Sequence, residues 1–121
     1  MMEIGIDIVE ISRIEKMSNI NTFLEKNFSK REIEYILQKN SSANTIAGIF
    51  ACKEAFLKAV GIGLFAGIRL CEIEVLHQQN GKPYIEITPQ INYYLQSVNA
   101  SSISVSIAHD GLYAIAECLL S

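Results

Sequence analysis

The stretch AGIFACKEAFLKAVGIG, residues 47–63, contains the centre and the end of the longest helix that this sequence predicts. Alanine, isoleucine, phenylalanine and leucine recur at helical spacing, which predicts a helix from about Ala43 to Val60 that stops at Gly61. Four residues at steps of four share one ridge of it: Ile46, Phe50, Glu54 and Lys58. An acid and a base therefore continue an apolar stripe.

The segment before this helix begins with EIGIDIV, residues 3–9, which is rich in β-branched residues and predicts a short buried strand. Apolar residues at helical spacing follow from Glu10, with a break near residues 19–21. Ser29 and Glu32 form a capping-box pattern, which predicts the start of a second helix.

The segment after residue 63 predicts two hairpins and one helix. The hairpins join 70–76 to 83–87 through Asn80–Gly81, and 102–108 to 112–120 through His109–Gly111, with a helix at about 89–98 between them. The element order is β-α-α-α-β-β-α-β-β. We therefore expect an α+β fold with a mainly antiparallel sheet in a single domain spanning residues 1–121.

Composition is that of a globular protein: 121 residues, 50% apolar and 19% charged. No apolar run approaches the roughly 20 residues needed to span a bilayer, and Glu3 and Asp7 stand where a signal peptide would be basic. We expect a soluble, cytoplasmic protein without membrane contact. The three cysteines, at positions 52, 71 and 118, lack metal or disulfide spacing and are expected to be buried packing residues.

Charge is distributed unevenly along the chain. The net charge of −3 argues against nucleic acid as a partner. All ten lysines and arginines lie at or before Lys82, and residues 12–31 have a local balance of +3. This basic segment suggests docking of an acidic partner, although a solvated helix surface would look the same.

Asp7 and Glu54 are the two carboxylates that the predicted elements do not explain. A carboxylate inside an apolar strand needs a cap, an ion pair or a bound cation, and Glu54 could simply pair with Lys58 at the helix surface. Magnesium commonly takes one or two protein carboxylates and completes its shell with water and substrate phosphate oxygens. A magnesium site would therefore imply a phosphate-bearing substrate.

Three further segments contain residues that are weaker candidates for a functional site. The segment Gly61–Gly63 follows a helix, where glycine usually serves as a C-terminal cap, although its backbone could approach a phosphate. His109, at a hairpin tip, could contact a phosphate, act as an acid or base, or be a turn residue. His77 has no companion signal and is expected at the surface.

Five segments together resemble the holo-acyl-carrier-protein synthases, a family of 4′-phosphopantetheinyl transferases. The most specific are the patterns G-x-D-I-V-E-I-x-R-I at Gly5–Ile14 and F-x-x-K-E-A-x-x-K-A at Phe50–Ala59. The others are FSKREIEYI (28–36), EIEVLHQQNGKPYIEI (72–87) and SISVSIAHDGLYAIA (102–116). The resemblance covers essentially the whole chain and implies the 4′-phosphopantetheinyl transferase fold.

The resemblance also implies roles for individual residues. It assigns the metal ligands to Asp7 and Glu54 and places Arg13 on the helix that meets acyl carrier protein. Several residues would line the coenzyme A site: Lys58, which is also a catalytic candidate, Gly61, Gly63, the turn Asn80–Pro83 with Lys82 and Pro83, and His109. Three positions depart from the family's usual residues, namely Ile6, Cys52 and Ala108, and the last puts a hydroxyl contact to substrate in doubt.

The implied reaction is attack by a carrier-protein serine on the pantetheine-side phosphorus of coenzyme A, releasing adenosine 3′,5′-bisphosphate, as a step in fatty acid biosynthesis. Magnesium would neutralise and orient the pyrophosphate, and Lys58 would stabilise developing charge. The general base is open between Glu54 and a water on the metal. Two other readings are a magnesium-dependent nucleotide hydrolase and a non-catalytic oligomerisation module that binds an acidic partner.

The last predicted strand indicates self-association. One of its faces has Tyr113, Ile115 and Leu119, and the other has Leu112, Ala114, Ala116, Cys118 and Leu120. A domain of this size cannot cover two apolar faces of a sheet, so we expect a homo-oligomer. The family resemblance specifies a homotrimer with active sites at subunit boundaries.

Overall fold

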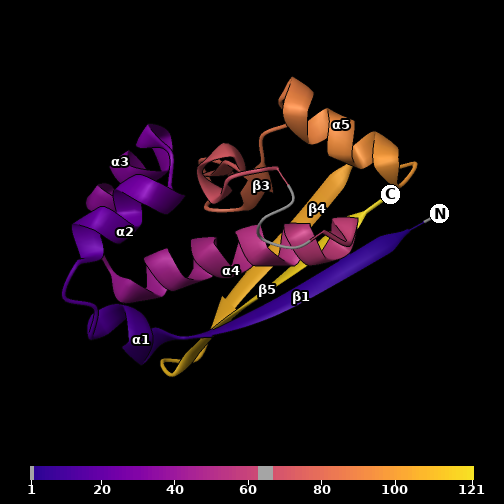
Figure 1. Ribbon diagram of the computed structural model, residues 1–121. Helices are drawn as coiled ribbons and strands as arrows, with labels where there is room; N and C mark the ends of the chain where they lie inside the picture. The colour runs from indigo at the N-terminus through magenta and orange to yellow at the C-terminus, as the bar shows by residue number, and fades with distance from the viewer. Residues whose placement is uncertain (1, 63–66) are drawn as a thin grey trace.

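A computed structural model of the chain describes residues 2–62 and 67–121 (Figure 1). The first half consists of β1 (Glu3–Glu10), α1 (Ile11–Glu15), α2 (Ile20–Asn27), α3 (Lys30–Gln38) and α4 (Ala43–Val60). The second half consists of a 3-10 turn η1 (Leu70–Glu72), β2 (Val75–His77), β3 (Pro83–Ile85), α5 (Pro89–Ser97), β4 (Ile103–His109) and β5 (Tyr113–Leu120). No helix among these residues is long and apolar enough to cross a membrane.

The main sheet is antiparallel, with strand order β1-β5-β4, and α4 lies across one of its faces (Figure 1). The strands β2 and β3 form a separate antiparallel pair. The predicted α+β fold with a mainly antiparallel sheet is confirmed. The two ends of the chain meet in the sheet, because Glu3 on β1 pairs with Leu120 on β5.

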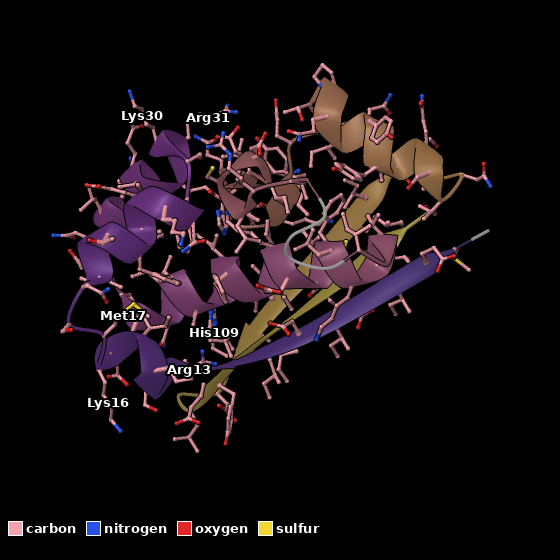
Figure 2. All side chains as sticks on the ribbon, in the orientation of Figure 1. Arg13, Lys16, Met17, Lys30, Arg31 and His109 are labelled. Carbon is pink, nitrogen blue, oxygen red and sulfur yellow. The ribbon has the colours of Figure 1, made fainter. Side chains whose placement is uncertain are left out.

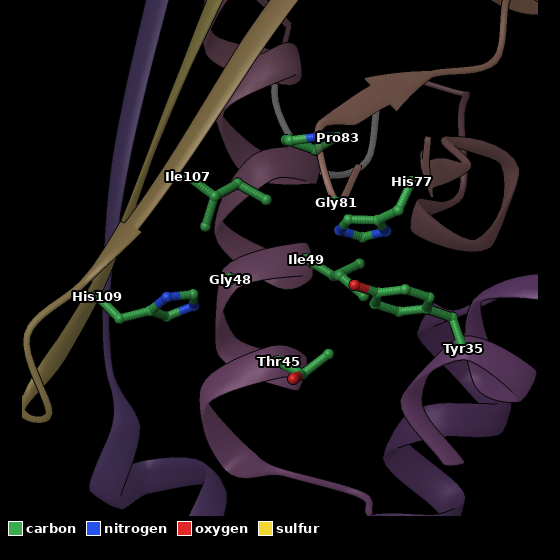
Figure 3. A pocket seen from close by; sticks show the side chains of 9 residues that line it. All are labelled: Tyr35, Thr45, Gly48, Ile49, His77, Gly81, Pro83, Ile107 and His109. Atoms are coloured by element: carbon green, nitrogen blue, oxygen red, sulfur yellow. The ribbon is translucent and has the colours of Figure 1, made fainter. Parts of the chain in front are cut away.

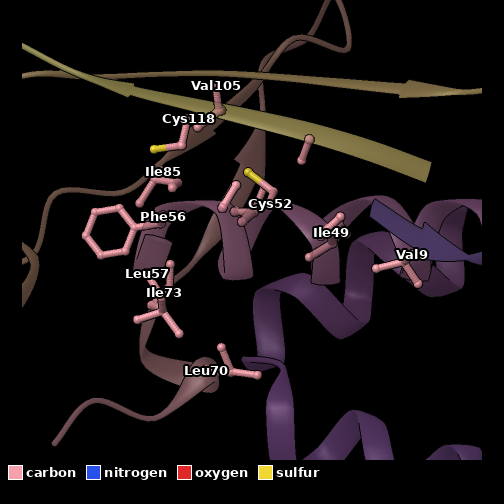
Figure 4. Close-up of a cluster of buried hydrophobic side chains, with 14 of the residues drawn as sticks. Val9, Ile49, Cys52, Phe56, Leu57, Leu70, Ile73, Ile85, Val105 and Cys118 are labelled. Atoms are coloured by element: carbon pink, nitrogen blue, oxygen red, sulfur yellow. The ribbon is translucent and has the colours of Figure 1, made fainter. Parts of the chain in front are cut away.

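The buried core lies between α4 and the sheet, and it extends to η1 and the β2–β3 pair (Figure 4). Ala114, Ala116, Cys118 and Leu120 on β5 are all fully buried, so this face of the sheet is covered by α4. Burial raises the pKa of the Cys118 thiol to about 12, and Cys52 is also buried. Cys71 is only half-buried, contrary to expectation.

The sheet and α4 make a close backbone contact at Gly5. A Cβ atom at this position would lie 2.0 Å from the Ala55 carbonyl oxygen and 2.6 Å from the Ala59 backbone nitrogen. Both obstacles are backbone atoms, which cannot move aside as a flexible side chain can. Glycine is therefore required for β1 and α4 to approach this closely.

Two elements differ from the sequence prediction. The break predicted in the first helical segment is present, but it lies at residues 16–19 rather than 19–21; it separates α1 from α2 and includes Ser18 and Asn19, which are poor helix formers. The strand predicted for residues 70–76 begins instead as η1, and the strand itself covers Val75–His77. The carbonyls of Leu70 and Ile73 accept hydrogen bonds from the buried Lys53 ammonium, which turns them away from any partner strand.

Candidate functional site

Glu54 lies on the predicted α4 ridge, near the end of the ridge that reaches solvent. Ile46 is buried, Phe50 and Glu54 are half-buried and Lys58 is exposed, so the ridge rises out of the core toward its C-terminal end. The helix ends as predicted, with Gly61 in the left-handed conformation at φ 88°. Glu54 therefore lies at the boundary between the core and solvent, where a carboxylate can reach a ligand.

Asp7 lies next to this ridge, on the face of β1 that packs against α4. Its carboxylate Oδ1 accepts a hydrogen bond of 2.9 Å from the Lys58 ammonium, which also donates to the Ile6 carbonyl at 3.1 Å. The Asp7 side chain is 16% exposed and the Lys58 side chain 56%. The simple surface pairing of Lys58 with Glu54, considered from the sequence, is wrong, because Lys58 pairs with Asp7.

Electrostatically, Glu54 is the less compensated of the two carboxylates. Burial raises the pKa of Glu54, the negative charge of Asp7 raises it further, and Lys58 lowers it in part. No hydrogen bond or ion pair to Glu54 is found among the residues that the structure describes. Two carboxylates thus share one ammonium, and a further cation between them would be stabilised.

The donor set fits a weakly chelated magnesium ion. The described residues contain no group of three or more histidine, cysteine, aspartate or glutamate side chains arranged around one point, so a closed site with all-protein ligands is not formed. Two carboxylates alone leave most positions of an octahedral ion to water and phosphate oxygens, which is the usual arrangement for magnesium at phosphate substrates.

A second cluster surrounds His109, in a cleft of about 160 Å³ (Figure 3). Its lining residues are Tyr35, Thr45, Gly48, Ile49, His77, Gly81, Pro83, Ile107 and His109. A Cβ at Gly48 would lie 2.9 Å from both His109 Nε2 and Ile107 Cγ2. The glycine therefore lets the imidazole lie directly against α4.

His77 and Tyr35 were missed by the sequence analysis, and the prediction that His77 lies at the surface is wrong. The two rings stack with centroids 3.9 Å apart and an angle of 2° between their planes, on the side of the cleft facing His109 (Figure 3). Burial, and secondarily Lys39, lowers the pKa of His77. The two residues are 42 positions apart in the sequence, and no local pattern predicts their contact.

The residues assigned to one coenzyme A site thus fall into two clusters. Asp7 and Ile107 pair with the same β5 residue, Ala116, from opposite sides, which places their Cα atoms roughly 10 Å apart. Ala116 is fully buried under α4, so the helix stands between the two clusters. Asp7, Glu54 and Lys58 belong to one cluster.

Pro83 and His109 belong to the other cluster, and Gly81 lines the same cleft. Lys82 is exposed on the neighbouring turn, where its backbone N–H bonds to the Asn80 side chain. Gly61 caps α4 beyond Lys58. Gly63 lies outside the described residues.

The basic segment does not form one patch (Figure 2). Arg13 lies on α1 and Lys16 caps its C-terminal end, whereas Lys30 and Arg31 lie at the far end of the helical region (Figure 2). Arg31 is also neutralised by Glu74 through bonds of 2.6 and 3.1 Å. The positive charges of residues 12–31 therefore lie in separate places: Arg13 and Lys16 at the C-terminal end of α1, Lys30 and Arg31 on α3, and Lys26 beside a cavity that borders Glu54.

A larger, mainly apolar cavity of about 380 Å³ borders Glu54. Phe23 and Phe50, with ring centroids 5.4 Å apart, line it together with Ile68 and Leu70. Lys26 and Arg69 are the cations among its lining residues. Glu54 is thus flanked by an apolar surface with positive charge beside it.

Comparison with known proteins places this chain and its fold in a family. The profile of the 4′-phosphopantetheinyl transferase superfamily matches residues 3–118. A holo-[acyl-carrier-protein] synthase of Clostridium beijerinckii is 42% identical, over 97% of this chain and 94% of its own length. One from Treponema denticola is 40% identical, over 99% and 98% of the two chains.

Solved structures agree with the sequence comparison. The Helicobacter pylori holo-[acyl-carrier-protein] synthase in complex with coenzyme A matches with a TM-score of 0.84 at 36% identity, covering 98% of this chain and 99% of the other. The Bacillus anthracis synthase matches with a TM-score of 0.80 at 32% identity, covering 98% and 94%. The chain therefore belongs to the family of holo-[acyl-carrier-protein] synthases.

Proposed function

We propose that this chain transfers the 4′-phosphopantetheine group of coenzyme A to a serine of acyl carrier protein and releases adenosine 3′,5′-bisphosphate. The observation that carries this conclusion is full-length membership of the family together with the adjacent carboxylates on β1 and α4. We propose further that the reaction takes place in the cytoplasm, serves fatty acid biosynthesis and uses all 121 residues as one transferase domain.

Asp7 and Glu54 are the residues that would hold magnesium, which when bound supplies charge neutralisation to the coenzyme A pyrophosphate. Lys58, exposed beside both carboxylates, can reach a phosphoryl oxygen and stabilise the charge that develops there. The His109 cleft, with Pro83 and Gly81 in its lining, would hold another part of the coenzyme. The partial burial of Asp7 and Glu54 limits the competition of bulk water at the reacting phosphate.

Mass spectrometry of the carrier tests the activity directly. Incubating the protein with magnesium, coenzyme A and apo-carrier should increase the carrier's mass by one phosphopantetheine group. Release of adenosine 3′,5′-bisphosphate at the same rate without carrier would instead indicate a nucleotide hydrolase. An unmodified carrier that nevertheless co-purifies with the protein would support a non-catalytic binding module.

We propose that the protein assembles as a homotrimer with sites at subunit boundaries, as the family resemblance implies. The sheet face opposite α4 supports assembly, because its isoleucines are exposed in a contiguous group: Ile4 63%, Ile6 58%, Ile8 57% and Ile115 40%. The two clusters on either side of α4 support shared sites, since a neighbouring subunit could bring its His109 cleft to this subunit's carboxylate pair.

Sedimentation velocity at micromolar concentration should show a trimer for the unmodified protein. Ile115→Lys places a charge in the middle of the exposed face, so we expect dissociation and loss of most transfer activity. Leu37→Lys is the matched control, because Leu37 on α3 is 62% exposed and lies away from the sheet. A fully active monomer of the unmodified protein would refute the assembly.

We propose that acyl carrier protein, acidic in the resembling systems, docks on α1 at Arg13, six residues after Asp7. Arg13 is exposed, and exposed charges of this kind mainly steer association. Arg13→Glu should raise the KM for the carrier by roughly tenfold at low salt, and less at high salt, because screening acts over about 8–10 Å. The KM for coenzyme A should stay nearly unchanged.

Lys30→Glu makes the same charge change at a site remote from Arg13 (Figure 2) and is the control. Kinetics for both substrates at two ionic strengths decide the question. If Arg13→Glu changes only the KM for coenzyme A, Arg13 belongs to the nucleotide site. If Arg13→Glu and Lys30→Glu change the KM for the carrier equally, the effect is one of net charge and not of docking at Arg13.

A further inference from the structure

Lys58 is placed where a metal ion would compete with it. Its ammonium lies 2.9 Å from Asp7 Oδ1 and 3.1 Å from the Ile6 carbonyl oxygen, and it stabilises the charge of neighbouring Glu54 as well. An ammonium with two oxygen acceptors on β1 and a carboxylate from α4 nearby is in the position expected of a small cation.

The side chain is also free to leave this position. Lys58 lies in the last turn of α4, and its side chain is 56% exposed. Its four-carbon stem is flexible, and its ammonium can exchange one anionic partner for another at similar distance. By contrast, the Lys53 ammonium has three buried acceptors and cannot move without leaving them unpaired.

We propose that Lys58 occupies the cation position on Asp7 until coenzyme A arrives, and that it then moves to the pyrophosphate and frees Asp7 for the metal. This inference rests on the proposed function. It gives Lys58, beyond its contact with the phosphate, the role of coupling the binding of the two ligands, since a divalent ion binding alone must displace an ammonium of like charge. Metal and coenzyme A would therefore enter the site together.

The test measures Mn²⁺ binding by electron paramagnetic resonance, without carrier protein, so that no turnover occurs. Lys58→Met keeps the length of the side chain and removes its charge. In the absence of coenzyme A we expect this variant to bind Mn²⁺ roughly tenfold more tightly than the unmodified protein. The increase in Mn²⁺ affinity on adding coenzyme A should be smaller in the variant.

Lys30→Met is the matched control, because it removes one exposed positive charge from α3 and should leave Mn²⁺ affinity unchanged. The double variant Asp7→Asn, Lys58→Met should not show the increase in Mn²⁺ affinity expected of Lys58→Met alone. The inference is overturned if Lys58→Met binds Mn²⁺ no more tightly than the unmodified protein. It is also overturned if Lys30→Met increases Mn²⁺ affinity by as much, or if the increase persists in the double variant with Asp7→Asn.

The outcome is separable from that of the proposed function. If the unmodified protein modifies its carrier but Lys58→Met binds Mn²⁺ no more tightly, the inference alone fails. If the unmodified protein does not modify any carrier, the proposed function fails, whatever the Mn²⁺ titrations show. Circular dichroism of each variant confirms that the comparison is made between folded proteins.

Discussion

Replacing Asp7 by asparagine, or Glu54 by glutamine, should leave the protein folded and reduce transfer about a thousandfold. Each change keeps the shape of the side chain and removes the negative charge that would hold magnesium at the pyrophosphate. Charge stabilisation by a bound metal contributes several kcal/mol to a transition state, and each 1.4 kcal/mol corresponds to about a tenfold change in rate.

The measurement is the rate of carrier modification at saturating magnesium and coenzyme A. Glu25→Gln serves as control, because Glu25 is an exposed carboxylate on α2 and its removal makes the same change in net charge. Thermal unfolding of all variants checks the fold. Near-normal turnover of either Asp7→Asn or Glu54→Gln would show that these carboxylates do not hold the metal.

Replacing Lys53 by methionine should destabilise the protein by about 3–5 kcal/mol, the usual cost of breaking a buried ion pair. Lys53 and Glu32 have fully buried side chains, and the ammonium donates to Glu32 Oε1 at 2.6 Å. It also donates to the carbonyls of Leu70 and Ile73 at 2.7 and 2.9 Å. Methionine fills the volume but leaves Glu32 charged and these carbonyls unpaired.

The stability lost on replacing Lys53 by methionine should depend on pH, and electrostatics fixes the direction of this dependence. Burial raises the pKa of Glu32 even beside Lys53, and without the ammonium the pKa must rise further. When the pKa of a carboxyl group is higher in the folded than in the unfolded state, the free energy of unfolding falls as the pH rises from the unfolded-state pKa through the folded-state pKa. Lys53→Met should therefore cost less stability at pH 5 than at pH 8.

Urea unfolding at both pH values measures this difference. The double variant Lys53→Met, Glu32→Gln should recover part of the lost stability, because the amide oxygen can still accept one of the bonds that Ser29 and Val75 N–H groups donate to Glu32. A cost of Lys53→Met that is below 1 kcal/mol, or equal at both pH values, would contradict this account of the pair.

Much of the fold was predictable because local patterns and tertiary packing agree. The apolar spacing of α4 and the turn at Asn80–Gly81 are short-range signals, and the structure has a helix and a hairpin there. Asp7 and Glu54 could be selected because each interrupts an apolar pattern. Their proximity, however, depends on how β1 packs on α4, which only the family resemblance indicated.

The remaining differences come from contacts that no local pattern records. Lys53 and Glu54 are adjacent in sequence, yet one is fully buried and the other half-buried. The buried acceptors of Lys53 also explain why residues 70–72 are not a strand. The stacking of Tyr35 on His77, and the position of α4 between His109 and Asp7, are likewise properties of the assembled layers.

The contact at Gly5 has a consequence for the dimensions of the carboxylate site. Gly5 stands two residues before Asp7, and it touches the backbone of Ala55, the residue that follows Glu54. The approach of the two backbones that carry these carboxylates, β1 and α4, is therefore limited by main-chain atoms. Repacking distant parts of the core would leave this approach unaltered, and a protein engineer seeking a wider site for a larger ion would have to alter the lengths of the ligands themselves.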